Sequence, residues 1–253
     1  MKYNLDKIIA SRPTKTVYKD NGYTIKLFVE DYSKANILNE ALNHARVEES
    51  TNLNIPKLTE VTTINNRWAL VTEHIEGQTL EMLMNKYPKK EQELLEVFVG
   101  IQLEVLEQKV PLLNRIKDKF RRKLTEAKNI EENSRYELLQ RLEGFKNHNK
   151  LCHGDFNPSN IIVTEKGEYY IIDWSHATQG NASADAARTF LLFSMQGKDK
   201  LAEQYLKLFS EKSGIPRKNI QRWIPIVAAT QMTKGKEEEY EFLSKWIDIV
   251  DYE

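Results

Sequence analysis

The pattern of apolar and polar positions divides the chain into a strand-rich first third and a helix-rich remainder. Short stretches in which apolar residues alternate with polar ones, bounded by turn residues, predict β-strands. Asn21-Gly22 lies between two such stretches and is a strong signal for a hairpin turn. One helix is predicted over residues 33–50, because Ser33 can cap it and apolar residues recur behind it at helical spacing. The predicted strands cover residues 5–10, 15–20, 23–30, 58–64 and 67–72.

From residue 79 onward, apolar residues recur every three or four positions, which predicts helices. One short hairpin interrupts them, at residues 161–163 and 169–172, on either side of a Lys166-Gly167 turn. The pattern therefore predicts an α+β fold: a five-stranded antiparallel sheet with one helix, then a mostly helical part that contains a small hairpin. The predicted helices cover residues 79–86, 90–109, 112–129 and 131–147, a segment that begins after the loop to residue 183, and residues 198–213, 216–233 and 236–252.

Composition and charge narrow the class of protein. The 253 residues include 37 basic and 37 acidic side chains, and this zero net charge argues against nucleic acid as the main partner. Cys152 is the one cysteine, so a disulfide framework is excluded and a reducing cytoplasm is the expected location. No apolar stretch approaches the length of a transmembrane helix, so no membrane partner is expected.

Oxygen-bearing side chains lie at the ends of the predicted hairpin. Asp155 and Asn160 precede its first strand, and Asp173 closes its second strand. A tight hairpin can bring such positions together. Two hard oxygen ligands and a further carboxylate suit Mg²⁺ bound to substrate phosphates, because Mg²⁺ keeps several waters and takes few protein ligands. This stretch therefore predicts phosphoryl transfer.

The spacing within this stretch resembles that of a known superfamily. His153 to Asn160 read H-G-D-F-N-P-S-N, and I-I-D-W follows the hairpin. Kinase-type catalytic loops have a His, an Asp two residues later, an Asn five residues after the Asp, and a second Asp after the next hairpin. Gly154 in place of Arg, and Asp-Trp in place of Asp-Phe-Gly, resemble the aminoglycoside phosphotransferase and choline kinase superfamily more than the eukaryotic protein kinases.

This resemblance implies a bilobal protein-kinase-like fold. Its N-terminal nucleotide-binding lobe would cover residues 1–73, its hinge residues 74–77, and its helical C-terminal lobe, with the catalytic loop and acceptor site, residues 78–253. The implied activity is transfer of the γ-phosphate of ATP or GTP to a hydroxyl of a small, aminoglycoside- or choline-like molecule.

The resemblance also assigns roles to residues of the catalytic stretch. Asp155 would be the catalytic base, while Asn160 and Asp173 would hold Mg²⁺. Three further residues would support the catalytic loop without reacting: His153, Asp185 and Arg188.

Nucleotide-binding positions are implied in the first third of the chain. Lys26, on the third predicted strand, would hold the α- and β-phosphates and pair with a helix glutamate, either Glu40 or, as the alternative, Glu48. Residues 11–14 lie where a loop covering the phosphates belongs; this loop has no glycine but offers Ser11 and Thr14. The implied purine contacts are backbone groups of Glu73, His74 and Ile75.

The acceptor and two other classes of function stay open. An acidic segment at residues 236–253, with Trp223 or Trp246, would suit a cationic acceptor. A run of basic residues at 117–123 would instead suit an anionic acceptor. A protein-directed or regulatory kinase is a second possibility, although no Ala-Pro-Glu segment is present. A catalytically weak nucleotide-binding module is a third, suggested by the glycine-free loop.

Overall fold

The computed structural model describes residues 2–247, and the chain forms two compact units. Unit 1 contains the described residues up to Pro88 together with Pro158–His176. Unit 2 contains Lys89–Asn157 and the described residues from Ala177 onward. The chain therefore passes from one unit to the other three times, and one crossing falls inside the predicted catalytic loop, at the Asn157–Pro158 peptide bond.

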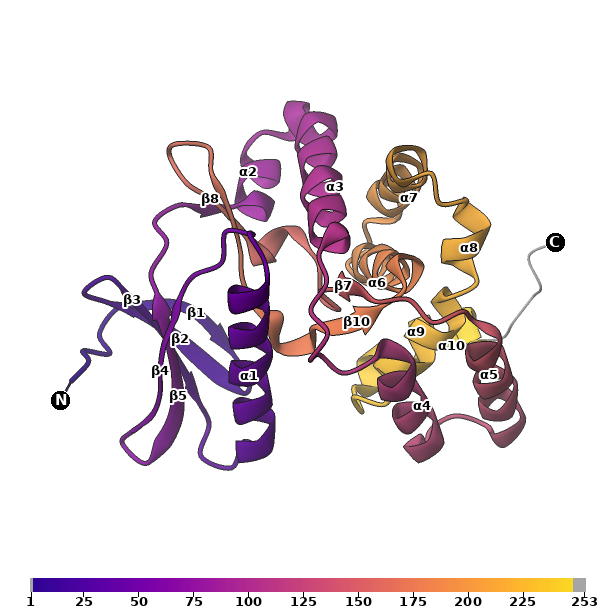
Figure 1. The fold of residues 1–253 in the computed structure, drawn as a ribbon, viewed down its shortest axis with the longest axis horizontal. Helices are drawn as coiled ribbons and strands as arrows, with labels where there is room; N and C mark the ends of the chain where they lie inside the picture. Colours follow the sequence, from indigo (N-terminus) through magenta and orange to yellow (C-terminus); the bar gives the residue numbers. More distant parts are fainter. Residues whose placement is uncertain (1, 248–253) are drawn as a thin grey trace. The chain divides into compact units, whose positions relative to one another are not determined.

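Unit 1 is built on a five-stranded antiparallel sheet with the order β1-β2-β3-β5-β4 (Figure 1). Asn21 and Gly22 have φ values of 42° and 80°, as expected for the tight hairpin turn between the second and third strands. The five predicted strands are confirmed. Their bounds are β1 Ile8–Arg12, β2 Lys15–Asp20, β3 Tyr23–Phe28, β4 Leu58–Ile64 and β5 Arg67–Glu73.

The first strand differs in position from its prediction over residues 5–10. It starts later and runs on to Arg12, where Ser11 pairs with Thr16 and Arg12 pairs with Lys15. Sheet pairing thus absorbs half of the predicted loop at residues 11–14 and leaves Pro13-Thr14 as a two-residue turn.

The predicted helix of unit 1, α1 (Lys34–Ser50), is confirmed with Ser33 as its cap, whose side chain accepts the Asn36 N–H at 3.3 Å. It packs on β4 and β5 (Figure 1). Alternate residues of β3 face opposite sides of the sheet. Phe28 belongs to the cluster with Ile37 of α1, so Lys26, two residues earlier, faces the same side.

Unit 1 also contains the predicted hairpin, which is confirmed as β8 (Ile161–Val163) paired with β9 (Tyr169–Ile171). A two-residue strand, β6 (Gln78–Thr79), pairs with β8. This strand is too short to show any periodicity and was not predicted. Gly77 permits the approach, because a Cβ there would collide with the carbonyl of Val163. The remaining elements of unit 1 are α2 Leu80–Lys86 and the 3₁₀ turns η2 Pro158–Asn160 and η3 Trp174–His176.

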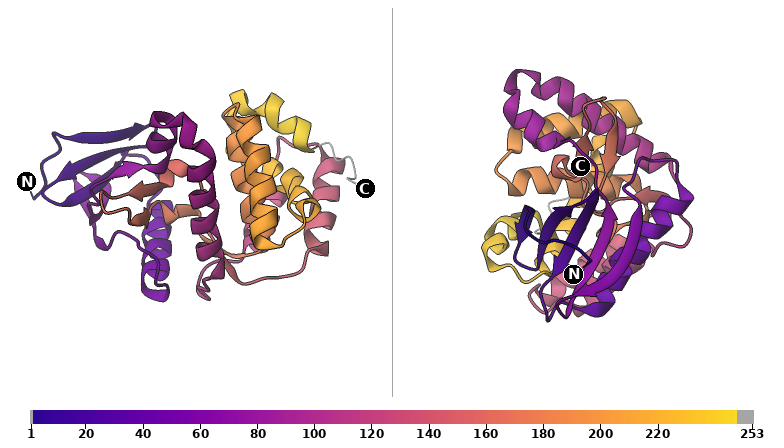
Figure 2. Two further views of the ribbon diagram at one scale, coloured as in Figure 1. Left: turned by 90° about the horizontal axis from the view of Figure 1, so that it is seen from above. Right: turned by 90° about the vertical axis from the view of Figure 1, so that its left-hand side faces the viewer.

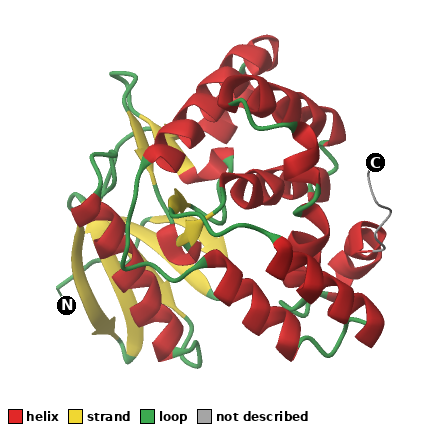
Figure 3. Cartoon of the chain, turned by 45° about the vertical axis from the view of Figure 1, so that its right-hand side comes forward, coloured by secondary structure: helices red, strands yellow, loops and turns green. Residues whose placement is uncertain are grey.

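Unit 2 is mostly helical, with one short antiparallel strand pair, β7 and β10 (Figure 3). Helices α6 and α7 lie side by side (Figure 2, orange). The elements are α3 Glu91–Glu107, α4 Ile116–Glu126, α5 Glu132–Gly144, β7 Lys150–Cys152, β10 Thr178–Gly180, α6 Ala182–Met195, α7 Asp199–Ser213, α8 Arg217–Gln221, α9 Ile224–Met232 and α10 Tyr240–Ile247.

Two helix predictions in unit 2 require correction. The single helix predicted over residues 216–233 is broken between α8 and α9. Pro225 lies in the first turn of α9, and because proline has no backbone N–H it cannot continue the hydrogen bonds of a preceding helix. The helix predicted over 236–252 starts with a 3₁₀ turn, Glu237–Glu239, followed by α10. Its last predicted residues, 248–252, lie outside the described residues.

The core of unit 2 includes an aromatic cluster that reaches the catalytic stretch. Phe98 of α3 packs against Phe156 with ring centroids 4.8 Å apart, and against Phe193 and Tyr205 at 5.7 and 6.0 Å. Phe156 is fully buried. Burying an aromatic side chain is strongly favourable, so this packing fixes the backbone next to Asp155. Within residues 2–247, no helix has the length and apolar character needed to cross a bilayer.

Candidate active site

Asp173 follows β9 in a strained backbone conformation. Its φ is 63°, in the left-handed region that residues other than glycine seldom occupy. Lys15 Nζ donates to its Oδ2 at 3.1 Å, and Lys26 Nζ lies 3.5 Å from its Oδ1. Strain of this kind persists only where the surroundings hold the residue in place, and it is concentrated at functional sites.

Lys26 lies between two carboxylates. Besides Asp173, it forms an ion pair with Glu40 of α1, which is 7% exposed. The alternative partner, Glu48, does not contact Lys26; its Oε2 accepts the Leu58 N–H at 2.9 Å. Burial alone would lower the pKa of Lys26, but Asp173 and Glu40 outweigh burial and raise it. Lys26 is therefore a fixed positive charge.

Asp173 has the properties of a hard cation ligand. Burial would raise its pKa, but Lys26 and Lys15 outweigh burial and hold the pKa well below its usual range, so the group is a carboxylate. Its buried Oδ1 accepts no hydrogen bond from any described residue. The backbone carbonyl of Asn160 accepts the Ile172 N–H at 3.0 Å, which places Asn160 and Asp173 at the same end of the hairpin.

This oxygen pair fits Mg²⁺. Among residues 2–247, no cluster of three or more His, Cys, Asp and Glu side chains is arranged to hold a metal. Mg²⁺ needs no such cluster, because it binds through one or two protein oxygens and completes its coordination with waters and substrate phosphates. Oδ1 of Asp173, which accepts no hydrogen bond from the described residues, is an oxygen of the required type.

The segment predicted to bind the purine follows β5. The N–H groups of Glu73 and His74 donate to the carbonyls of Lys57 and Gly22 at 2.9 and 2.8 Å. A purine contact here would therefore use the remaining backbone groups of Glu73, His74 and Ile75. The His74 ring lies 2.8 Å from Thr24 Oγ1, and burial and Lys19 lower its pKa, so it is neutral at pH 7.

Residues 11–14, predicted to cover the phosphates, form the end of β1 and a two-residue turn. Ser11 is part of β1, and the Thr14 carbonyl accepts the Val29 N–H at 3.1 Å. Lys15, directly after the turn, reaches Asp173 instead. Lys15 was not predicted as a site residue, because nothing in its sequence neighbourhood distinguishes it from a solvent-facing lysine on a strand.

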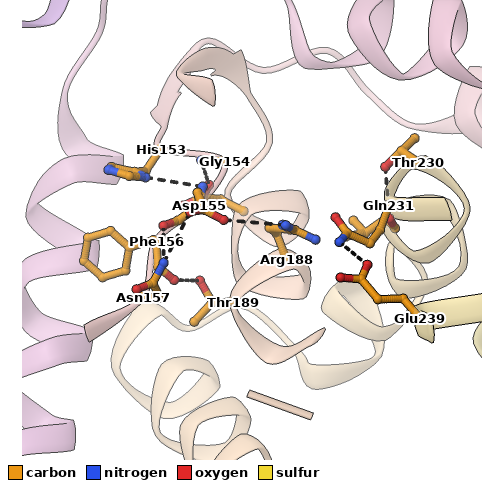
Figure 4. Close-up of polar contacts among 12 residues, drawn as sticks. His153, Gly154, Asp155, Phe156, Asn157, Arg188, Thr189, Thr230, Gln231 and Glu239 are labelled. Atoms are coloured by element: carbon orange, nitrogen blue, oxygen red, sulfur yellow. Dashed lines mark hydrogen bonds and ion pairs between the residues drawn. The ribbon is translucent and has the colours of Figure 1, made fainter. Parts of the chain in front are cut away.

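In unit 2, three residues of α6 contact three successive residues of the predicted catalytic loop. Asp185, Arg188 and Thr189 lie at positions i, i+3 and i+4, which share one face of a helix. Asp185 Oδ1 accepts the Gly154 N–H at 2.7 Å. Arg188 Nη2 lies 3.5 Å from Asp155 Oδ1, and Thr189 Oγ1 donates to the Phe156 carbonyl at 2.9 Å (Figure 4).

Hydrogen bonds of Gln102 and His153 further stabilise this arrangement of the loop and α6. Gln102 of α3 donates to Asp185 Oδ2 at 3.1 Å; the sequence analysis missed this residue, which appeared only as a polar position on a helix. The Asp155 N–H donates to Nδ1 of the buried His153 at 3.3 Å. Burial raises the pKa of Asp185, although the hydrogen bonds from Gly154 and Gln102 oppose the shift.

The basic residues of the segment 117–123 lie on two different faces of α4. Lys117 Nζ donates to the carbonyls of Glu143 and Phe145 at 3.2 and 2.7 Å, and Arg121 pairs with Glu143 at 2.7 Å. These two residues face α5. Lys119 and Lys123 lie on another face, with charged neighbours that include Arg188.

Among the described residues, both tryptophans named for a possible cationic-acceptor site pack against other aromatic rings. Trp223 is buried and stacks on Phe145 at 4.0 Å, and Trp246 packs edge-on against Phe190 at 5.6 Å. Glu239 is bound to Gln231 and Lys236. Glu237, Glu238 and Glu241 are exposed, and the last three acidic residues of this segment, Asp248, Asp251 and Glu253, lie outside the described residues.

A five-stranded sheet with one helix and a mostly helical second unit define the bilobal protein-kinase-like fold that the sequence predicted. Residues 66–218, more than half of the chain, match the sequence model of the Phosphotransferase enzyme family. The chain belongs to this family.

Solved structures of aminoglycoside phosphotransferases share the fold. A thermostable mutant of APH(4)-Ia in a ternary complex with ADP and hygromycin B has a TM-score of 0.68 at 13% identity, covering 95% of this chain and 89% of that one. ADP-bound APH(2'')-Ib has a TM-score of 0.62 at 18% identity, covering 98% and 93%. An aminoglycoside-3'-phosphotransferase of type VIII has a TM-score of 0.64 at 13% identity, covering 90% and 93%. No curated protein matches the chain by sequence.

Proposed function

We propose that the protein is a Mg²⁺-dependent kinase that transfers the γ-phosphoryl group of ATP to a hydroxyl group of a small molecule. The observation that carries this proposal is the environment of Asp173: an ionised carboxylate on a strained backbone, with a buried oxygen that lacks a hydrogen bond, beside the Lys26–Glu40 pair. A half-buried carboxylate flanked by two lysines suits a site for a cation and a polyphosphate together.

Each residue of unit 1 has a role in this proposal. Lys26 holds the α- and β-phosphates, and Glu40 fixes its ammonium group. Asn160 and Asp173 hold Mg²⁺, which when bound neutralises negative charge on the transferring phosphoryl group. The donor-binding lobe extends to residue 73, and a hinge at residues 74–77 binds the purine. Ser11 and Thr14 lie beside Lys15 at the phosphate end of the sheet.

Asp155 acts on the acceptor, in the lobe that covers residues 78–253. Its carboxylate accepts the proton of the acceptor hydroxyl as the hydroxyl oxygen bonds to the γ-phosphorus and the bond to the bridging oxygen breaks, so ADP leaves. Because the transition state is loose, the positioning of Asp155 accounts for most of its effect. Asp185, His153 and Arg188 position it through the contacts described above.

Two solved structures that share the fold support a nucleotide donor, because both contain ADP. The test is a thermal-shift titration with ATP and GTP, each with and without Mg²⁺, followed by a panel of hydroxyl acceptors read by ADP release. We expect stabilisation by ATP that depends on Mg²⁺ and is lost in Asp173→Asn. Turnover with a protein acceptor alone would favour the protein-directed kinase. Nucleotide binding with no turnover on any acceptor would favour the weak binding module.

A further inference from the structure

Four cationic side chains gather near Asp155 within unit 2, and we call them the basic cluster: Lys119, Lys123, Arg188 and Lys234. Lys119 and Lys123 are one helical turn apart on α4, so they share a face. Arg188 is on α6, and Lys234 follows the end of α9. Helix α9 packs on both α4 and α6, so three separate elements bring these charges together.

The electrostatic effects of the cluster's members on one another show that they lie close together. Burial first, and then Lys123, Lys234 and Arg188, lower the pKa of Lys119 to about 7. Lys234 is exposed, and the nearby positive charge of Arg188 also lowers its pKa. Arg122, on the same helix as Lys119, contributes in the same direction. At Lys234, two acidic groups oppose these effects: Asp155 and Glu239 raise its pKa.

Among residues 2–247, the two acidic groups Asp155 and Glu239 leave the four cations with a net positive charge. Asp155 lies 3.5 Å from Arg188, and Glu239 is engaged by Lys236 at 3.0 Å and by Gln231. Lys123 and Lys234 form no hydrogen bond or ion pair with any residue of the described chain. Like charges brought together and partly withdrawn from water repel, so such a cluster is costly unless an anion joins it.

Gln231 gives an independent indication of a ligand. It is 5% exposed, and its amide nitrogen donates to Glu239. Its Oε1 is buried and accepts no hydrogen bond from any residue in the described part of the chain. Figure 4 shows the Gln231 amide facing Arg188, which in turn faces Asp155. A buried polar atom without a partner in a native protein calls for a water or ligand that donates to it.

We propose that the acceptor is an anionic small molecule: a compound with a hydroxyl group and a phosphate or carboxylate group. The basic cluster binds the anionic group, Gln231 Oε1 accepts a hydrogen bond from another hydroxyl, and the reacting hydroxyl reaches Asp155. This inference rests on the proposed function, because it names the substrate class of the same site.

The same charges disfavour the polycationic acceptors expected from the resemblance. Within the described part of the chain, these four cations have two carboxylate neighbours, Asp155 and Glu239, and Glu239 already has a lysine partner. Placing like charges together at a binding site is unfavourable, so this arrangement disfavours binding of an aminoglycoside.

The first experiment measures acceptor binding in the full-length protein saturated with Mg²⁺ and AMP-PNP, so that the nucleotide site is filled. The calorimetric probes form matched pairs: glycerol with glycerol 3-phosphate, and ribose with ribose 5-phosphate. Glycerate tests a carboxylate, and kanamycin and choline test cations. We expect binding of at least one anionic probe and none of its neutral partner. If no anionic probe binds at millimolar concentration, or if a cation binds more tightly than every anion, the inference is wrong.

The second experiment attributes binding to the cluster. Lys123→Gln and Lys234→Gln should each weaken binding of the anionic probe about tenfold, which corresponds to about 1.4 kcal/mol. Lys128→Gln removes an exposed lysine just beyond α4 and serves as the matched control, with unchanged affinity expected. Equal affinities in all three variants would overturn the assignment of the site.

Failure of this inference and failure of the proposed function are distinguishable. Mg²⁺-dependent stabilisation by ATP depends on residues of unit 1 and not on the basic cluster. Loss of anion binding with intact ATP stabilisation refutes only the acceptor class, whereas absence of ATP stabilisation refutes the kinase.

Discussion

Asp185 accepts a hydrogen bond from the backbone N–H of Gly154 at 2.7 Å, and this bond ties α6 to the residue directly before Asp155. Gly154 has a φ of 76°, so the loop turns here in a conformation that suits glycine. The carboxylate of Asp185 therefore holds the point at which the loop changes direction.

Replacing Asp185 with Ala should destabilise the protein and reduce turnover together. The substitution leaves the Gly154 N–H without its acceptor, and an unsatisfied buried donor costs about 1–3 kcal/mol. We expect the urea midpoint and kcat to fall while Mg²⁺-dependent stabilisation by ATP remains. The matched control is Asp199→Ala, which removes an exposed carboxylate from the first turn of α7. A kcat equal to that of the control would show that Asp185 does not position the loop.

Replacing Glu40 with Gln should weaken nucleotide binding. The ion pair fixes the Lys26 ammonium, and without it Lys26 is left paired with Asp173 alone. We expect KM for ATP to rise more than tenfold, since breaking a buried ion pair costs about 3–5 kcal/mol. Glu48→Gln is the control on the same helix, because a glutamine there can still accept the Leu58 N–H. Similar KM values for the two variants would separate the Lys26–Glu40 pair from nucleotide binding.

Asp155→Asn should abolish turnover without affecting ATP binding. An amide cannot accept the proton of the acceptor hydroxyl, and general-base catalysis contributes about 10²–10⁴ in rate. The measurements are kcat by ADP release and the thermal shift with Mg²⁺ and ATP. A variant that keeps wild-type kcat would exclude Asp155 as the base, and one that loses the ATP shift would place Asp155 in nucleotide binding.

The sequence predicted those parts of the site that depend on local pattern. The strands, the hairpin and the H-x-D spacing are periodic or contiguous features, and the structure has these elements at or near their predicted positions. Contacts between distant segments left no such pattern. Lys15 pairs with a residue 158 positions away, and Gln102 bonds to one 83 positions away.

The spacing of the basic residues on α4 explains why the predicted basic segment at residues 117–123 divides into two groups. The basic residues of α4 were treated as one cluster. Lys117 and Arg121 are four residues apart, as are Lys119 and Lys123, so two separate faces follow from the spacing alone. What the spacing does not give is which face meets α5 and which lies near Arg188, because that depends on how the helices of unit 2 pack.

The depressed pKa of Lys119 makes stability and anion binding depend on pH. Burial and its cationic neighbours lower this pKa from about 10.5 to about 7. Below pH 7, Lys119 is charged in both the folded and unfolded protein, and the full cost of the charge is present. Between pH 7 and 10.5 the unfolded chain binds a proton that the folded protein has lost, so this group makes stability rise with pH. Lys119→Gln should therefore raise the unfolding midpoint more at pH 6 than at pH 9.

An anion bound to the cluster stabilises the charged form of Lys119, so binding of the anion at pH 8 should be accompanied by uptake of a proton. Calorimetry in Tris and in HEPES, whose ionisation enthalpies differ, measures this uptake. Identical binding enthalpies in the two buffers, with a midpoint gain independent of pH, would show that Lys119 keeps an ordinary pKa.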